Sequence, residues 1–190
     1  ANAIQNTEVV FGPGSVVYGS DAIGGVMNFT SLTPGTSSLG TKFSANAFAR
    51  YASANEEKTG HADFSIGLKK WAFVTSITKS DFSDLKMGAN GPVEYTRPDY
   101  QVRDENGNDI TVVNPNPNVQ IFSGYNQLNG MQKVRFTPNA NWDFTYGFHF
   151  SETSDVPRYD RLILKNASNV FTSADWYYGP QKRLLGAYEL

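Results

Sequence analysis

The stretch that decides the fold is EVVFGPGSVVYGSDAIGGVMNF, residues 8–29. Residues 8–11 are rich in β-branched side chains, which favour a strand. Gly12, Pro13 and Gly14 end that strand, because glycine permits positive φ and proline fixes φ and removes a donor. We expect one helical turn over residues 15–18, a stop at Gly19, and a bend at Gly24 and Gly25 into a second strand over residues 26–30.

The order and spacing of these residues resemble the end of the plug domain of TonB-dependent outer-membrane receptors. The usual form there is E-V-V-R-G-P, a small residue, S, a short apolar run, Y-G-S and G-G-V-I-N, and the likeness covers residues 4–34. The matching positions are Glu8, Gly12, Pro13, Gly14, Tyr18, Gly19, Gly24 and Gly25. In the family, an arginine at the position of Phe11 and the glutamate matching Glu8 belong to a charge network between plug and barrel. The basic half of that contact is not expected here.

A phosphate-binding loop is an alternative for this glycine-rich turn, since glycine turns before helices bind phosphates. No Lys-Ser or Lys-Thr pair follows Gly14, and no G-x-G-x-x-G pattern opens a long helix. Nucleotide binding is therefore disfavoured. Structural turns in some other β-protein are the remaining alternative.

The composition excludes several classes of function. A formal net charge of −2 over 190 residues gives no electrostatic pointer to nucleic acid. The absence of cysteine excludes disulfides, thiolate metal sites and cysteine nucleophiles. No apolar run approaches the ~18 residues of a membrane helix, whereas an aromatic content of 14% suits the aromatic girdles of a transmembrane β-barrel. No signal peptide is visible and the resemblance starts inside a plug, so we expect further chain before residue 1.

Beyond a linker rich in Pro, Gly and Ser at residues 33–38, apolar and polar residues alternate as in strands with two different faces. Strands are expected at 42–51, 61–69, 71–81, 131–137 and 142–151, and a further one begins within 176–190. Turns are expected at 55–60 and 138–141, and long loops at 82–130 and 151–175. Tight turns on one side and long loops on the other are typical of transmembrane barrels.

The predicted fold class is all-β: a fragment of a transmembrane antiparallel β-barrel, preceded by the C-terminal part of a plug domain. About six strands are expected of the roughly 22 that a barrel around a plug takes. Residues 1–38 are assigned to the plug and residues 39–190 to the N-terminal part of the barrel.

Candidate site residues lie on the predicted polar faces and in the second long loop. His61 and His149 each read as a hydrated lumen residue or as a haem or metal ligand. Arg50, Lys133 and Arg135 share the polar face, where we expect them to pair with plug carboxylates; guidance of an anionic substrate is the alternative. Residues 104–109 have the composition of a calcium loop without its ligand spacing, so a solvated loop is expected. No catalytic motif is present, and neither an enzyme nor a resident cofactor or metal is expected.

Residues 157–162 and 175–181 resemble segments of the haem, haemoglobin and transferrin branch of these receptors. Arg158, Tyr159 and Arg161, with His149, are therefore candidate ligand contacts. The resemblance implies a receptor in the bacterial outer membrane, embedded in the lipid bilayer, that imports an iron–siderophore or haem and is energised by the TonB complex of the inner membrane. The alternatives are a cobalamin or glycan importer of the same fold and, from a different class, a secreted β-sandwich module that binds glycans.

Overall fold

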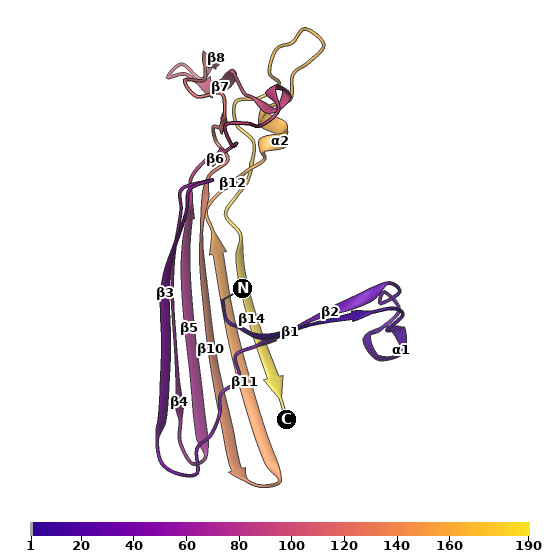
Figure 1. The fold of residues 1–190 in the computed structure, drawn as a ribbon, viewed down its shortest axis with the longest axis vertical. Coiled ribbons are helices and arrows are strands. Elements are labelled where there is room, and N and C mark those ends of the chain that lie inside the picture. Colours follow the sequence, from indigo (N-terminus) through magenta and orange to yellow (C-terminus); the bar gives the residue numbers. More distant parts are fainter. Residues whose placement is uncertain (1) are drawn as a thin grey trace.

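The computed structural model describes residues 2–190, except for the side chain of Ser15. The chain is all-β, and its strands pair antiparallel. Six strands form one sheet in the order β14-β11-β10-β5-β4-β3, so the long strands neighbour each other in sequence order (Figure 1). They are β3 (Lys42–Ala52), β4 (Glu57–Gly67), β5 (Trp71–Phe82), β10 (Tyr125–Asn139), β11 (Trp142–Thr153) and β14 (Lys182–Glu189).

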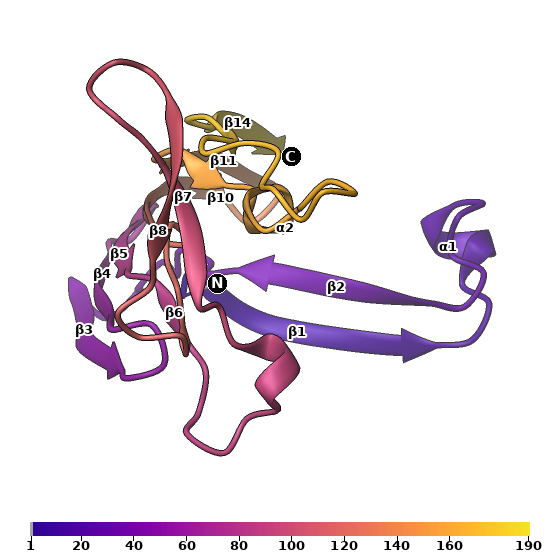
Figure 2. The same ribbon diagram turned by 90° about the horizontal axis from the view of Figure 1, so that it is seen from above.

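A separate hairpin precedes the sheet. It consists of β1 (Ile4–Phe11), α1 (Ser15–Tyr18) and β2 (Gly25–Ser31), and is called the N-terminal hairpin below. Seen from above, the six strands curve around the side from which the hairpin projects (Figure 2). The predicted order of strand, helical turn and strand is confirmed.

The two ends of the sheet differ. At one end, residues 68–70 and 140–141 make tight turns; at the other, called the loop end, two long segments connect β5 to β10 and β11 to β14 (Figure 1). These segments contain the two-stranded pairs β6-β9, β7-β8 and β12-β13 and two short helices. Their bounds are β6 (Leu85–Lys86), η1 (Val93–Tyr95), β7 (Asp99–Arg103), β8 (Asp109–Val113), β9 (Val119–Gln120), β12 (Val156–Pro157), α2 (Tyr159–Leu162) and β13 (Tyr177–Tyr178).

Several predicted boundaries are wrong. β10 begins at Tyr125 rather than at residue 131. The apolar alternation did not reveal its first residues, because Gln127 and Asn129 are polar and lie opposite Ser80 and Thr78 on a polar face. β10 also continues to Asn139, so the turn predicted at 138–141 is shorter. β4 begins inside the predicted turn at 55–60. The strand expected to begin within 176–190 is β14, which starts at Lys182, and the short strand β13 precedes it.

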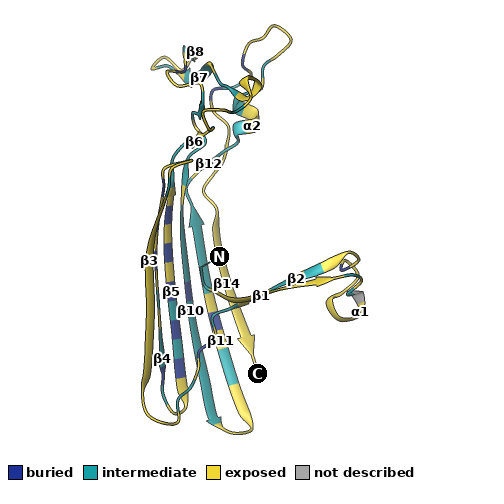
Figure 3. Cartoon of the chain, in the orientation of Figure 1, coloured by how far each residue is buried: buried dark blue, intermediate teal, exposed yellow. Residues whose placement is uncertain are grey.

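Burial in this chain is mostly polar. Ala72, Val74 and Met131 are buried apolar residues of the sheet. The buried side chains of Glu57, Thr59, His61, Ser76, Thr78 and Ser80 are polar or charged. Among the described residues, β3 and β14 each pair with one neighbour, so the sheet is open, and both edge strands are exposed along most of their length (Figure 3).

Candidate functional site

The six-stranded sheet has two chemically different faces, and directly paired residues share a face. The face toward the N-terminal hairpin, called the polar face, carries Asn46, Arg50, Glu57, Thr59, His61, Asp63, Ser76, Thr78, Ser80, Gln127, Asn129, Lys133, Arg135, His149, Ser151 and Arg183. The opposite face, called the apolar face, carries Phe43, Ala45, Ala47, Ala62, Phe64, Ile66, Trp71, Phe73, Ile77, Val134, Phe136, Phe144, Tyr146, Phe148, Phe150, Leu184 and Tyr188. The predicted alternation over residues 142–151 is confirmed.

Side chains on the polar face bond to one another across strands. His61 lies between Thr78, with 2.7 Å from Nδ1 to Oγ1, and Asp63, with 3.1 Å from Nε2 to Oδ2. Asn46 on the next strand donates to the same Asp63 carboxylate at 3.1 Å. Both ring nitrogens of His61 are therefore occupied within the sheet, which leaves neither nitrogen free to ligate haem or a metal.

Three basic residues of the polar face, Arg50, Lys133 and Arg135, have partners within the sheet or on backbone oxygens. Arg50 pairs with Glu57, and Arg135 donates to Asp143 with 2.8 Å from Nε to Oδ1. In each case the carboxylate lies two residues from the direct cross-strand partner, within diagonal reach of a long side chain. The expected pairing with carboxylates of the N-terminal segment is therefore wrong for Arg50 and Arg135.

The N-terminal hairpin and its linker meet the polar face through backbone carbonyls. Arg135 Nη1 donates to the Pro34 oxygen at 3.2 Å, and Lys133 Nζ lies 3.5 Å from the Ser31 oxygen. The Ser37 amide also donates to the Leu68 oxygen at 3.0 Å. These contacts attach the hairpin to the polar side of the sheet.

His149 lines a pocket of about 400 Å³ between the sheet and the start of the N-terminal hairpin. Ile4 and Ser31 of the hairpin, and Asn129 and Arg183 of the sheet, also line it. The structure thus places His149, a predicted ligand contact, in a pocket of mixed polar and apolar lining.

The motif residues of the N-terminal hairpin are held mainly by backbone geometry. Gly12 and Gly19 have φ of 92° and 99°, the left-handed region that favours glycine. The Gly14 amide donates to the Ala22 oxygen at 2.9 Å, and the Gly14 oxygen accepts the Tyr18 amide at 2.9 Å. The turn after Pro13 is therefore closed by its own backbone.

Gly25 and Glu8 mark the two strands of the hairpin. Gly25 has φ of 151°, and a Cβ there would lie 2.7 Å from the Val10 oxygen, whereas Gly24 has open space around it. The Glu8 carboxylate accepts hydrogen bonds from Asn6 at 3.3 Å and Asn28 at 3.4 Å. Phe11 is 88% exposed. Within the described residues, Glu8 is therefore held by amides of its own hairpin.

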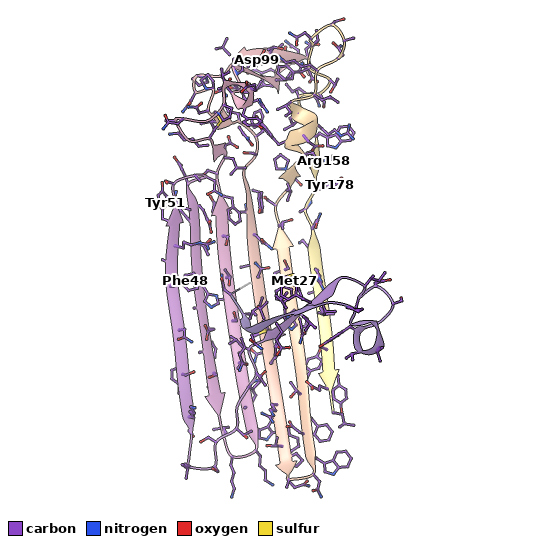
Figure 4. All side chains as sticks on the ribbon, turned by 45° about the vertical axis from the view of Figure 1, so that its right-hand side comes forward. Met27, Phe48, Tyr51, Asp99, Arg158 and Tyr178 are labelled. Carbon is purple, nitrogen blue, oxygen red and sulfur yellow. The ribbon has the colours of Figure 1, made fainter. Side chains whose placement is uncertain are left out.

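Arg158 at the loop end is held by two neighbours. Its Nε donates to Asp160 at 2.9 Å and its Nη1 to the Tyr178 hydroxyl at 2.8 Å, with the guanidinium 5.2 Å from the Tyr178 ring centre. Figure 4 shows Arg158 and Tyr178 close together beyond the long strands. Arg158 holds the pKa of Asp160 below its usual range. The guanidinium is thus engaged in joining α2 to β13.

Tyr159 and Arg161 lie on the same helical turn but in different surroundings. Burial raises the pKa of Tyr159, which lines a small pocket with Tyr100 and Phe171, so its phenol stays neutral at ordinary pH. Arg161 is exposed, with 3.8 Å from its Nε to the Asp160 carboxylate. These residues lie beyond the end of β11, whereas His149 lies inside the strand, so the four predicted contacts do not form one site.

Aromatic side chains gather where the sheet has its tight turns. Trp71 stacks on Phe136 with ring centres 4.1 Å apart, and Trp142 stacks on Phe144 at 5.7 Å. At the loop end, Trp176, Tyr177 and Tyr178 are each about half exposed. The chain therefore carries aromatic residues at both ends of its long strands.

Two features of the structure were not predicted from the sequence. Thr75 donates to Gln132 at 2.5 Å on the apolar face, where each interrupts a run of apolar residues. Phe122 has φ of 66° and lines two pockets among the loops. The polar pair becomes visible once the register is known. No local sequence signal marks Phe122.

No group of three or more His, Cys, Asp or Glu side chains among the described residues is arranged to hold a metal ion. Within residues 2–190, no helix has both the length and the apolar character needed to cross a membrane. Comparison with models of known protein families, with curated proteins and with solved structures found no match. The function is therefore inferred from the geometry and from the sequence pattern.

Proposed function

We propose that this chain is part of an outer-membrane active-transport receptor, with the N-terminal hairpin as the end of a plug and the six-stranded sheet as part of the barrel wall. One observation carries the proposal: the hairpin and its linker contact the polar face, while the described residues leave the apolar face uncovered. A β-sandwich would bury such a face against a second sheet. Here Phe43 is 64% exposed and Ile77 is 53% exposed. An uncovered apolar face suits lipid.

The size of the apolar face supports this placement. From Trp142, near the tight turns, to Glu152, β11 advances ten residues, or about 33 Å along the strand. At the ~40° tilt of barrel strands this is about 25 Å along the membrane normal, the height of the apolar band in outer-membrane barrels. Lys79 and Lys182 lie in the same row as Glu152, so charged residues bound the band at the loop end.

The connections support one orientation. Outer-membrane barrels have short periplasmic turns and longer external loops. The turns at 68–70 and 140–141 then face the periplasm, and the two long segments face outward. Ligand capture is assigned to these outer segments, because binding residues are commonly carried on loops that a rigid scaffold positions.

The resemblance of residues 8–29 to a plug end supplies the rest of the proposal. The plug closes the lumen until energy arrives from the inner membrane through the TonB complex. The imported ligand is proposed to be an iron–siderophore or haem. Arg158 is already engaged by Asp160 and Tyr178. The more exposed Arg161, with its neighbour Tyr159, is therefore the pair to test.

Iron-limited growth tests the function. Cells without the receptor, and without other haem and siderophore receptors, should not grow on haem or a ferric siderophore, and the wild-type receptor should restore growth only when TonB is intact. Tyr159→Ala with Arg161→Ala should reduce uptake at equal abundance in the outer membrane. Glu105→Ala, in the other long segment, is the matched control.

Three outcomes separate the alternatives. Restored growth on cobalamin or a glycan, but not on iron carriers, would change the ligand and keep the receptor. Uptake that does not require TonB would overturn the transport mechanism. A protein that stays in buffer without detergent, and folds there cooperatively, would instead indicate the secreted glycan-binding module.

A further inference from the structure

A pocket of about 340 Å³ lies among the outer loops, within the size range of small-molecule sites. Three segments far apart in the sequence contribute to it: β7, the chain just after β9, and the chain around β12 and β13. Aromatic walls come from Phe122, Trp176 and Tyr177, and the charged lining groups are Arg103, Asp155 and Asp175. We call it the aromatic loop pocket.

The lining of this pocket carries more negative than positive charge. Arg103 donates a hydrogen bond to Asp109 with 2.9 Å from Nε to Oδ1. Asp109 raises the pKa of this guanidinium, and Asp175 makes a weaker contribution in the same direction. Asp155 and Asp175 are exposed, and neither forms an ion pair within the part of the chain that the structure describes. One guanidinium therefore faces more carboxylates than it neutralises.

Phe122 has an unusual backbone conformation. Its φ of 66° is an outlier for a bulky residue. The Phe122 ring meets Tyr100 edge to face, with ring centres 5.7 Å apart, and forms a wall of the aromatic loop pocket.

We propose that the aromatic loop pocket binds an organic cation, an ammonium or guanidinium group carried on a small apolar body. Aromatic faces attract such cations through the ring quadrupole, and the carboxylates of Asp155 and Asp175 add charge complementarity. The same carboxylates disfavour an anionic group. The idea that this cationic group belongs to an imported ligand rests on the proposed receptor function. The idea that the pocket of the isolated chain binds such a cation does not rest on it.

Fluorescence of Trp176 provides the test. The chain has three tryptophans, so Trp71→Phe with Trp142→Phe leaves Trp176 as the single indole reporter. The full chain in detergent micelles is titrated with phenethylammonium, 2-phenylethanol and phenylacetate, which share a ring and differ in charge. We expect saturable binding of phenethylammonium with a Kd at least tenfold below that of 2-phenylethanol, and no saturable response to phenylacetate.

Substitutions assign the selectivity to the pocket. Asp155→Asn with Asp175→Asn should raise the Kd of phenethylammonium at least tenfold and leave that of 2-phenylethanol unchanged. Glu105→Gln, a carboxylate outside the pocket lining, should change neither. Equal affinity for the cation and the alcohol, tighter binding of phenylacetate, no saturable response to any probe, or an unchanged cation affinity in the Asn variant would each overturn the proposal. Loss of TonB-dependent uptake with binding intact would contradict the receptor and leave the pocket standing.

Discussion

Adjacent residues on β3 allow the two faces of the sheet to be compared at one depth. Ala45 lies on the apolar face, in the row of Phe64, Thr75 and Phe148. Phe148 is six residues beyond Trp142 and four before Glu152, so this row is near the middle of the apolar band. Asn46 lies on the polar face and donates to Asp63 at 3.1 Å. Both positions are exposed, so arginine fits sterically at either.

Ala45→Arg should lower the free energy of unfolding in lipid by about 2–4 kcal/mol, the cost of a cation on the lipid face near mid-depth. This corresponds to a factor of about 30 to about 700 in the folding equilibrium. Asn46→Arg should stay within about 0.5 kcal/mol of wild type, because the position is hydrated and faces a carboxylate.

Urea titrations of the protein refolded into phosphatidylcholine vesicles measure both values. Equal penalties for Ala45→Arg and Asn46→Arg would refute the assignment of the faces. A larger penalty for Asn46→Arg would mean that the faces are reversed.

Three further predictions concern the N-terminal hairpin, the apolar face and an outer loop. Gly25→Ala should raise amide hydrogen exchange throughout β1 and β2, because its Cβ would meet the Val10 oxygen, whereas Gly24→Ala should leave exchange near wild type; equal effects would contradict the close approach. Thr75→Val with Gln132→Leu should raise stability in vesicles by about 1–2 kcal/mol, since polar groups leave hydrocarbon; destabilisation would indicate a wet or protein-covered face. The pKa of Asp104 is lowered below 3.8 mainly by the Asn108 amide, so the loop stabilisation is present above about pH 3.8 and is lost as pH falls through the lower folded value. Protection of the Asn108 amide should follow that loss and be pH-independent in Asp104→Asn, as measured by NMR; the same pH dependence of protection in wild type and in Asp104→Asn would refute this.

The local structure of the N-terminal hairpin was predictable because glycines at fixed spacing dictate where its strands end. Alternation of apolar and polar residues likewise predicted β3, β5 and β11 nearly to their ends. The start of β10 was not predictable by that rule, since Gln127 and Asn129 lie on a face where polar residues belong.

Side-chain partners depend on register, which composition does not supply. The pairing of Arg50 with Glu57 and of Arg135 with Asp143 follows from diagonal neighbours across strands. The aromatic loop pocket joins Arg103, Phe122 and Trp176, which no local pattern connects. The predicted ligand contact Arg158 likewise donates a hydrogen bond to Tyr178, which is twenty residues away in the sequence.

Cysteine labelling of intact cells tests the central claim, that the sheet crosses the outer membrane with its long segments outside. The chain contains no cysteine, so Asn116→Cys in the first long segment and Asn139→Cys beside a tight turn each introduce a single thiol, and both positions are exposed. An impermeant maleimide should label Asn116→Cys on whole cells, and Asn139→Cys only after the outer membrane is permeabilised. Labelling of Asn139→Cys on intact cells, alone or together with Asn116→Cys, would contradict the proposed membrane placement.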